Sequence, residues 1–239
     1  MACKSRYRCN SRTHYRNHSM KNGLEIYAVR KSFGNKKILE SVEFTLEKGE
    51  ILGVFGSNGS GKSTLLKILF GTLKPDFIDL RINGLPLAVK DVIPKQHIGY
   101  LPQDSFLPKH LKVRDIIPMF YEDGDAQDLI FRAPFVEKIA TRKAGLLSVG
   151  ERRYLELLLI AHLPHPFLML DEPFSMIEPL YKEAIATFLL SLKAKKGILL
   201  TDHYYKDVLA ISDRNMILVN GISHPANTEE DLKNLGYLR

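Results

Sequence analysis

Apolar residues in this chain occur in short runs that are separated by turn residues and by longer helical stretches. Runs typical of β-strands cover residues 24–29, 38–46, 51–55, 77–82, 167–170, 197–201 and 214–219. Helical spacing of apolar positions covers residues 63–70, 105–160 and 179–195. Strands that alternate with helices in this way predict a mostly parallel sheet with helices on both of its faces.

These patterns also predict how the chain is divided. The β-rich start and the helical middle indicate a composite of subdomains, with a helical subdomain at about residues 105–160. The 239 residues, of which 45% are hydrophobic, are enough to bury a core and exclude a mainly disordered chain. No run approaches about 18 consecutive apolar residues, so the sequence predicts no transmembrane helix.

The formal net charge of +7 is concentrated at the beginning of the chain. Residues 1–21 contain 6 basic and no acidic side chains, whereas the other 218 residues contain 28 basic and 27 acidic ones. The body of the protein is therefore close to neutral, and its composition does not favour a nucleic-acid partner. Residues 1–20 are polar and basic, so we expect a disordered extension in front of a domain at residues 21–239.

Both cysteines, Cys3 and Cys9, lie in this extension, so the sequence predicts no disulfide framework for the body, as in proteins of reducing compartments. The extension lacks the apolar stretch of a secretory signal. Cys3 and Cys9 with His14 and His18 match no spacing typical of a zinc site. A basic arm that contacts anionic lipid or nucleic acid is one alternative, but we favour an over-extended start, with the domain opening at Met20.

A glycine-rich segment joins the predicted strand at 51–55 to the predicted helix at 63–70. Its nine residues, here called the phosphate loop, are Gly56, Ser57, Asn58, Gly59, Ser60, Gly61, Lys62, Ser63 and Thr64. Glycines let the backbone curve around an anion with its N–H groups pointing inward, and the following helix adds its positive end. The pattern predicts that Lys62 contacts the β- and γ-phosphates of a nucleotide, Ser63 binds Mg²⁺ and Thr64 contacts the α-phosphate. The sequence lacks the guanine-reading motif of GTPases.

Two acidic residues, Asp171 and Glu172, directly follow the apolar run at 167–170. A buried strand that ends in Asp171 beside the phosphate loop would place this carboxylate next to Mg²⁺ or one of its waters. Glu172 would reach beyond the metal ion to the position of an attacking water. A general base or water-positioning group of phosphoryl transfer occupies that position, so we interpret Glu172 as catalytic.

These motifs, in this order, resemble the nucleotide-binding domain of ATP-binding cassette (ABC) ATPases from about residue 22 to residue 224. Five further family motifs have counterparts here: the adenine-stacking aromatic at Phe33, the Q-loop glutamine at Gln103, the signature at 147–151, the D-loop at 174–178 and the switch histidine at His203. The resemblance implies a P-loop NTPase of the α/β class. Its fold would combine a mostly parallel core sheet, an N-terminal antiparallel β subdomain and a short helical subdomain.

The resemblance also implies a role for these side chains within one subunit. Phe33 would stack on the adenine of ATP. Gln103 would contact Mg²⁺ or the attacking water, and its loop would sense a membrane partner. His203 would donate a hydrogen bond to the γ-phosphate and position Glu172. Glu172, His203 and Gln103 are therefore expected to be the catalytic residues of an ATPase.

Two signature residues, Ser148 and Gly150, would act on the ATP bound by a second nucleotide-binding subunit. The resemblance therefore implies a two-fold dimer, expected to be a homodimer, with two ATP molecules held between each phosphate loop and the opposing signature. The other implied partner is a separate transmembrane permease subunit, with this chain on the inner, cytoplasmic face of the cell membrane. We expect no nucleic-acid partner.

Two positions depart from the family pattern. Val149 replaces the first glycine of the signature, and a β-branched residue does not readily adopt a positive φ. Its side chain would also narrow the approach to phosphate. Glu178 replaces the usual D-loop aspartate, and its extra methylene is expected to disturb communication between the two sites. The hypothesis is that the signature tolerates Val149 with slower turnover. Only 44 residues separate Gln103 from Ser148, so we expect a short helical subdomain.

Three stretches, at 150–156, 170–174 and 201–203, look most like the lipopolysaccharide-export and branched-chain amino-acid subgroup of the family. We therefore expect an ATP-hydrolysing subunit that energises a separate membrane subunit through ATP-driven dimerisation. Two alternatives are left open by the sequence. One is a regulatory cassette that hydrolyses ATP weakly beside an active partner, and the other is a soluble ABC ATPase that acts outside transport.

Overall fold

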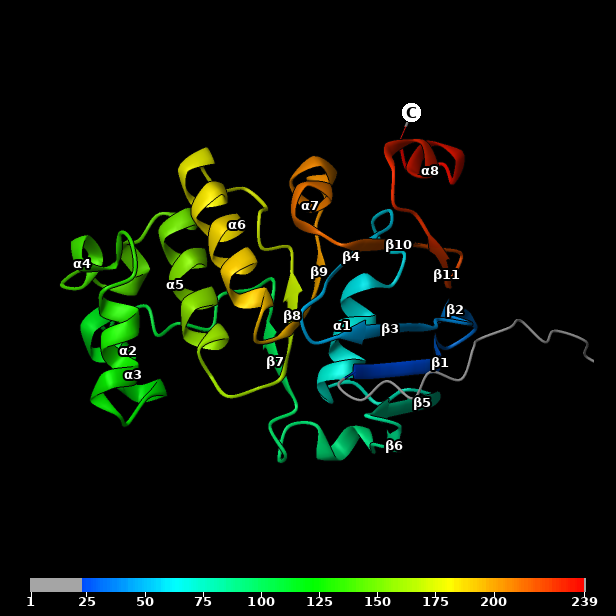
Figure 1. Cartoon of the computed structure of the whole chain (residues 1–239), viewed down its shortest axis with the longest axis horizontal. Coiled ribbons are helices and arrows are strands. Elements are labelled where there is room, and N and C mark those ends of the chain that lie inside the picture. Colours follow the sequence, from blue (N-terminus) through cyan, green and yellow to red (C-terminus); the bar gives the residue numbers. More distant parts are fainter. Residues whose placement is uncertain (1–22, 239) are drawn as a thin grey trace, which may run out of the picture.

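The structure of the protein is a computed structural model that describes residues 23–238 (Figure 1). The predicted basic extension, with its cysteines and histidines, lies outside the described residues. The described part consists of two β-sheets and the helices packed against them.

The larger sheet has six strands in the order β11-β10-β4-β9-β8-β7. Its strands are β4 (Ile51–Phe55), β7 (Ile98–Leu101), β8 (Phe167–Asp171), β9 (Gly197–Thr201), β10 (Arg214–Val219) and β11 (Ile222–Pro225). All neighbouring strands are parallel except β10 and β11, which form an antiparallel hairpin. The prediction of a mostly parallel core sheet is therefore confirmed. Because β4, β9, β8 and β7 are parallel neighbours, the residues that follow them meet at one edge of the sheet.

A second, antiparallel sheet is built around the long strand β1 (Gly23–Phe33). Its other strands are β2 (Lys36–Leu39), β3 (Phe44–Glu47), β5 (Phe77–Ile82) and β6 (Leu85–Pro86). The prediction of one strand over residues 38–46 is wrong, because β2 and β3 pair with opposite ends of β1 and are interrupted between them. At the interruption the N–H groups of Glu40 and Ser41 donate to Gly221 O instead, at 2.8 and 3.1 Å.

Side chains alternate between the two faces of the larger sheet and fill two separate cores. In β4, Ile51 and Phe55 belong to the core under α5, α6 and α7, whereas Leu52 and Val54 belong to the core that contains α1. These helices are α1 (Lys62–Phe70), α5 (Val149–Ala161), α6 (Pro179–Lys193) and α7 (Tyr205–Ile211). Figure 1 shows α5 and α6 on one side of the sheet and α1 with the antiparallel sheet on the other. Both faces of the larger sheet are therefore covered.

The residues between β7 and β8 include the predicted helical stretch, drawn in green in Figure 1. Its elements are α2 (Val113–Phe120), α3 (Gly124–Phe131), α4 (Val136–Ile139), a 3₁₀ helix (Ala144–Leu146) and α5. Backbone hydrogen bonds join the residues at the start of α2 to those before the 3₁₀ helix, because Val113 N–H donates to Arg142 O at 3.0 Å and Ala144 N–H donates to Leu111 O at 2.9 Å. Outside this stretch, a 3₁₀ helix at Val89–Asp91 precedes β7, and α8 (Glu229–Asn234) follows β11.

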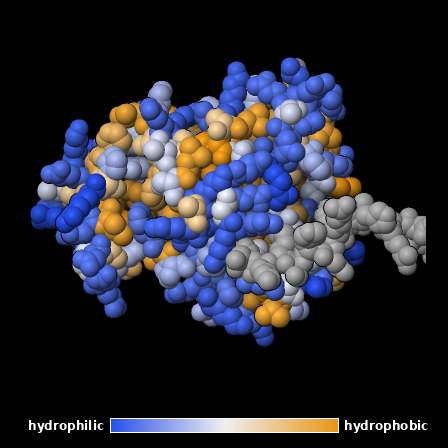
Figure 2. Space-filling view, viewed as in Figure 1, coloured by the Kyte–Doolittle hydropathy of each residue, from blue (hydrophilic) through white to orange (hydrophobic). Residues whose placement is uncertain are grey.

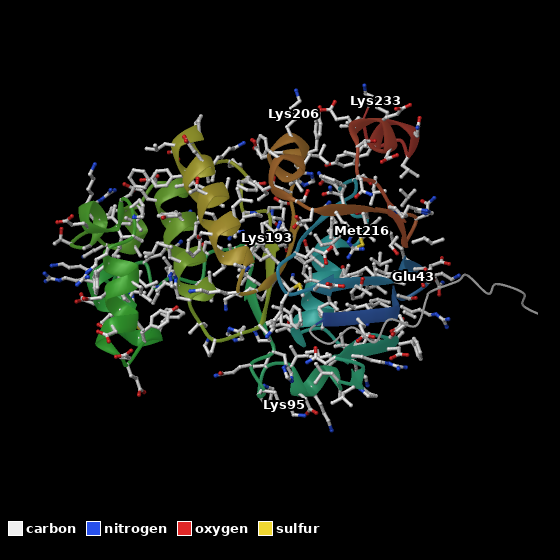
Figure 3. All side chains as sticks on the ribbon, viewed as in Figure 1. Glu43, Lys95, Lys193, Lys206, Met216 and Lys233 are labelled. Atoms are coloured by element: carbon white, nitrogen blue, oxygen red, sulfur yellow. The ribbon has the colours of Figure 1, made fainter. Side chains whose placement is uncertain are left out.

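The visible surface is largely polar. Figure 2 shows hydrophilic side chains over most of this face, with hydrophobic ones in separate patches between them. In Figure 3 the labelled Lys95, Lys206 and Lys233 lie on the outside of the molecule, whereas Met216 of β10 lies in the core beside α1. None of the helices within residues 23–238 combines the length and the apolar character needed to cross a membrane.

Candidate functional site

The phosphate loop lies between the end of β4 and the start of α1, as the sequence predicted. Gly56, Gly59 and Gly61 have φ angles of 153°, 79° and 105°, a region that favours glycine. Gly61 is the N-cap of α1, and a Cβ atom there would lie 2.8 Å from Leu39 Cδ2. Both the backbone conformation and the close approach of β2 therefore require glycine at this position.

Lys62, the first residue of α1, turns its side chain back over the loop. Its Nζ donates hydrogen bonds to Gly56 O at 2.6 Å and to Ser57 O at 3.2 Å. Burial lowers the pKa of Lys62, while the nearby carboxylates of Glu172 and Asp171 act in the opposite direction. An ammonium group has three N–H donors, so one donor is still free within the loop. This arrangement suits an anionic phosphate group.

Asp171 ends β8, and its carboxylate is buried beside the phosphate loop. Ser63 Oγ and Thr201 Oγ1 donate to Asp171 Oδ1 at 3.2 and 3.0 Å. The hydroxyl of Tyr100 donates to Asp171 Oδ2 at 3.2 Å. Burial and the Asp171 carboxylate raise the pKa of Tyr100, so its hydroxyl remains a protonated donor.

A hydroxyl and a carboxylate are hard oxygen ligands of the kind that Mg²⁺ prefers, so Ser63 and Asp171 fit this ion. Mg²⁺ sites in proteins usually combine one or two protein oxygens with waters and substrate phosphates. Within residues 23–238, no group of three or more His, Cys, Asp or Glu side chains forms a metal site by itself. The donor set therefore fits an ion that enters together with a nucleotide.

Glu172 is the residue on which the other predicted catalytic side chains converge. Its Oε2 accepts hydrogen bonds from Gln103 Nε2 at 3.0 Å and from Ser175 Oγ at 3.2 Å. Its Oε1 lies 3.0 Å from Nε2 of His203. The backbone of Glu172 has a φ of 57°, unusual for a residue other than glycine, and its N–H donates to Thr201 O at 2.9 Å. Such strained conformations cluster at functional sites.

A cavity of about 660 Å³ connects these groups with the predicted adenine-stacking residue. Its lining residues are Phe33, Lys36, Ile38, Asn58, Gly59, Gly61, Lys62, Ser63, Thr64, Gln103, Glu172 and His203. The ring of Phe33 is 51% exposed, and Nζ of Lys31 lies 5.0 Å from its centroid. The cavity thus offers an aromatic face at a distance from the cationic loop, which fits a nucleotide with its base on Phe33.

The signature residues lie outside this cavity. Ser148 is the N-cap of α5, where its Oγ accepts from Glu151 N–H at 3.1 Å and its N–H donates to Glu151 Oε2 at 2.7 Å. Neither Ser148 nor Gly150 lines the cavity around the phosphate loop of the same chain. A Cβ atom at Gly150 would lie 2.7 Å from Cδ2 of the Tyr181 ring on α6 and 2.3 Å from Glu178 Oε2, so close packing against α6 favours a glycine here.

Val149 does not strain the backbone, so that expectation is wrong. It is the first residue of α5 and does not have a positive φ. The right-handed helical conformation accepts a β-branched residue at little cost. The side chain is nevertheless 45% exposed at the start of the helix. What remains of the hypothesis is steric: an isopropyl group stands where the family has only a hydrogen atom.

One residue that holds this site together, Asp202, is assigned a role by none of the sequence motifs. Asp202 is fully buried, and its carboxylate accepts hydrogen bonds from Phe174 N–H at 2.7 Å and from Tyr204 N–H at 3.0 Å. Burial raises the pKa of Asp202, while these hydrogen bonds act in the opposite direction. Asp202 therefore joins the D-loop to the segment that carries His203. Its position next to His203 is the one sequence feature that could have drawn attention to it.

A sequence model of the ABC transporter family matches residues 39–175. Two similar proteins are lipopolysaccharide export system ATP-binding proteins LptB. The one from Acidithiobacillus ferridurans is 28% identical over 223 residues, 87% of this chain and 91% of that protein. The one from Escherichia coli K12 is 30% identical over 216 residues, 83% of this chain and 88% of that protein. The thiamine import ATP-binding protein ThiQ of Vibrio parahaemolyticus is 32% identical over 189 residues, 75% of this chain and 80% of that protein.

Solved structures show the same fold. A nucleotide-free ATP-binding cassette from an ABC transporter superimposes with a TM-score of 0.78 and 24% sequence identity, over 89% of this chain and 94% of that chain. An ATP-binding subunit of an ABC transporter gives a TM-score of 0.77 at the same identity, over 90% of this chain and 93% of that chain. The predicted P-loop NTPase architecture is therefore confirmed.

Proposed function

The chain belongs to the ABC transporter family as an ATP-binding, ATP-hydrolysing subunit, and from this premise we propose that two copies of it hydrolyse Mg²⁺-ATP at their shared interface to drive a separate membrane subunit. The observation that carries the proposal is the convergence of Gln103, His203 and Ser175 on the carboxylate of Glu172 beside the phosphate loop. On this proposal the chain works at the cytoplasmic face of the cell membrane. The similarity to LptB and ThiQ supports a transport role over a soluble ATPase that acts elsewhere.

In the proposed complex, ATP lies along the cavity with its adenine on Phe33 and its β- and γ-phosphates in the phosphate loop. Lys62 then exchanges its bonds with Gly56 O and Ser57 O for phosphate oxygens. Ser63 and Asp171, together with Gln103, would hold Mg²⁺, and the ion would neutralise phosphate charge. Thr64 contacts the α-phosphate.

Hydrolysis needs a water that loses a proton as it attacks the γ-phosphate. The Glu172 carboxylate accepts this proton, and Gln103, 3.0 Å from it, orients the water. Nε2 of His203 lies 3.0 Å from Glu172 Oε1, beside the catalytic carboxylate. With ATP bound, the N–H of His203 would donate to the γ-phosphate, where negative charge must be stabilised. Thr201 and Tyr100 keep Asp171 from rotating away from Ser63.

The signature residues supply the reason for a second copy. Ser148 and the N–H of Gly150 stand at the N-terminus of α5, the positive end of a helix, and neither residue lines the cavity around the chain's own phosphate loop. A helix N-terminus favours an anion, and the γ-phosphate bound by a second copy is the anion that the family resemblance implies. A two-fold arrangement would provide each phosphate loop with the signature of the other chain.

We expect ATP-dependent dimerisation when hydrolysis is blocked. The full chain carrying Glu172→Gln should elute as a monomer without nucleotide and at twice the monomer mass with Mg²⁺-ATP, because ATP links the two copies. Light scattering coupled to size-exclusion chromatography measures the mass, and ADP is the matched control. A variant that binds ATP stoichiometrically but keeps the monomer mass at every protein concentration would contradict the dimer.

The side chain of Val149 is expected to slow ATP hydrolysis. Val149→Gly and Val149→Ala remove the isopropyl group at the start of α5, so we expect kcat to rise by about threefold, a lowering of the barrier by about 0.7 kcal/mol. The alanine variant controls for backbone freedom, since glycine at a helix position costs about 0.5–1 kcal/mol relative to alanine. Phosphate release at saturating ATP is the measurement. An unchanged kcat in both variants would exclude the steric hypothesis.

A regulatory cassette is the second candidate, and one observation favours it. The Glu178 carboxylate lies against Gly150, so it adds negative charge close to the place where the second copy's γ-phosphate would bind. Like charges in close proximity weaken binding. This candidate predicts tight ATP binding with negligible hydrolysis by the chain alone. Hydrolysis should be restored in Glu178→Gln, which removes the charge, and in Glu178→Asp, whose shorter side chain withdraws the carboxylate from Gly150.

A further inference from the structure

Arg153 on α5 is a buried cation that the functions described so far do not use. Only 7% of its side chain is exposed. Nη1 donates to Pro102 O, and Nη2 donates to Asp171 O and, at 3.3 Å, to Glu172 O. The planar guanidinium therefore joins three chain segments: α5, the end of β7 and the end of β8. All three acceptors are backbone carbonyls, so the contacts fix the path of the main chain.

The hydrogen bonds of Arg153, here called the Arg153 bridge, lie just beyond the last paired residues of β7 and β8. The pairing of β7 with β8 ends at Leu101 and Leu170. Pro102 has no backbone N–H and cannot donate the next hydrogen bond of the ladder. The two strand ends would be free to separate beyond this point. Arg153 connects them across the gap by bonding to Pro102 O on one side and Asp171 O on the other.

The two bridged residues directly precede the two side chains that meet at the catalytic centre. Pro102 precedes Gln103, Asp171 precedes Glu172, and Gln103 Nε2 lies 3.0 Å from Glu172 Oε2. Glu172 also has its unusual φ of 57° at this point. A conformation of this kind persists only where surrounding contacts determine it. The guanidinium contacts the carbonyl oxygens of Asp171 and Glu172, which lie on the two sides of the Glu172 Cα, and so holds this turn.

A second buried charge extends the arrangement to the Q-loop. Glu156, one turn further along α5, is 2% exposed, and its Oε2 lies 3.6 Å from Arg153 Nη1. Ser105 Oγ donates to Glu156 Oε1. Replacing a buried ion pair by apolar residues is often neutral or stabilising, so stability alone does not explain this pair. Its geometry instead links the position of α5 to the segment that carries Gln103.

We propose that Arg153 is a positioning residue for ATP hydrolysis: it sets the separation of Gln103 from Glu172 and makes that separation depend on the position of α5. The inference rests on the proposed function, since it assigns Gln103 and Glu172 to water activation. Because α5 also begins with the signature, a contact made by a second copy at Ser148 would be transmitted through Arg153 to the catalytic carboxylate of the first.

The test variant is Arg153→Lys. Lysine keeps the positive charge that Glu156 needs, but its single nitrogen lacks the planar fork that can span both strand ends. We expect kcat to fall about tenfold with the KM for ATP changed less than about twofold, because an interaction important only in the transition state has been weakened. Arg132→Lys is the matched control, since Arg132 is the C-cap residue of α3 and 82% of its side chain is exposed. A kcat within twofold of the parent in Arg153→Lys would overturn the proposal.

Hydrogen exchange of the nucleotide-free chain gives a second readout that needs no catalysis. The amides of residues 103–105 and of Glu172, Phe174 and Ser175 should exchange faster in Arg153→Lys, while those of β4 and β10 remain unchanged. Uniformly faster exchange, or none, would overturn the positioning role. If the parent chain hydrolyses no ATP but the two segments still exchange faster in Arg153→Lys, the proposed function is wrong and the structural role of Arg153 is supported. If the parent hydrolyses ATP and Arg153→Lys has the same kcat and the same hydrogen exchange, the positioning role of Arg153 is wrong and the proposed function is supported.

Discussion

Replacing Glu172 by glutamine is expected to stop ATP turnover while leaving ATP binding intact. Glutamine has the same shape and still accepts hydrogen bonds through its carbonyl oxygen, so the contacts with Gln103 and Ser175 have an acceptor. It cannot take a proton from water. Loss of a general base costs about 10²–10⁴-fold in rate, and we expect a loss of about 10³-fold in kcat. Phosphate release from Mg²⁺-ATP measures turnover, and titration with a fluorescent ATP analogue measures binding.

Glu183→Gln is the matched control for this experiment. Glu183 is an exposed glutamate on α6, remote from the cavity around the phosphate loop, so its variant should hydrolyse ATP at the parent rate. Retention of more than about a tenth of the parent kcat by Glu172→Gln would mean that another group acts as the base. If parent and variant both bind ATP and neither hydrolyses it, the regulatory cassette becomes the better description of the chain alone.

Replacing Lys62 by methionine is expected to weaken the affinity for ATP strongly. The Nζ of Lys62 is the cation inside the phosphate loop, where it contacts Gly56 O and Ser57 O and where phosphate oxygens would replace these carbonyls. A hydrogen bond to a charged group contributes about 1.5–3 kcal/mol, so losing the phosphate contacts should weaken the Kd for ATP by about 100-fold. Isothermal titration of the full chain with Mg²⁺-ATP is the measurement.

The fold should tolerate this change, which separates binding from stability. Burial lowers the pKa of Lys62, a sign that its charge is held at a cost that methionine does not carry. We therefore expect a Tm within about 3 °C of the parent. Lys67→Met, on the exposed face of the same helix, is the control and should bind ATP normally. Normal ATP affinity in Lys62→Met would contradict the assignment of the phosphate loop.

The parts of the site that could be predicted from sequence are contiguous. The phosphate loop is one continuous segment of nine residues, and the positive φ angles of Gly56, Gly59 and Gly61 explain why glycine recurs in it. Asp171 ends, and Glu172 follows, a strand whose five residues are all buried. Local backbone conformation and burial depend largely on residues that are close in the sequence. Both can therefore be predicted without knowing the fold.

The elements that sequence patterns missed are short or depend on distant partners. β7 has only four residues and contains Gly99, so its apolar pattern is too brief to separate from a loop. The sequence pattern predicts β2 and β3 as a single strand. The two strands are separate because the N–H groups of Glu40 and Ser41 bond to Gly221, about 180 residues later in the chain, and no residue within 38–46 indicates this. Strand pairing of this kind is a property of the tertiary fold.

By itself, the sequence determined the mostly parallel α/β core, the phosphate loop, the carboxylates at the end of β8 and membership of the ABC family. Only the tertiary structure decided which groups surround Glu172 and Asp171. Tyr100 and Thr201 reach the carboxylate of Asp171, Ser175 reaches that of Glu172, and Arg153 reaches the backbone carbonyl of Asp171. They come from four separate segments, because the strand order places β7, β8 and β9 side by side. Hydrogen bonds between residues that meet only because their strands are neighbours produce no recognisable pattern in the sequence. A loop that curves around a phosphate, by contrast, requires particular residues at consecutive positions, so the sequence reveals it.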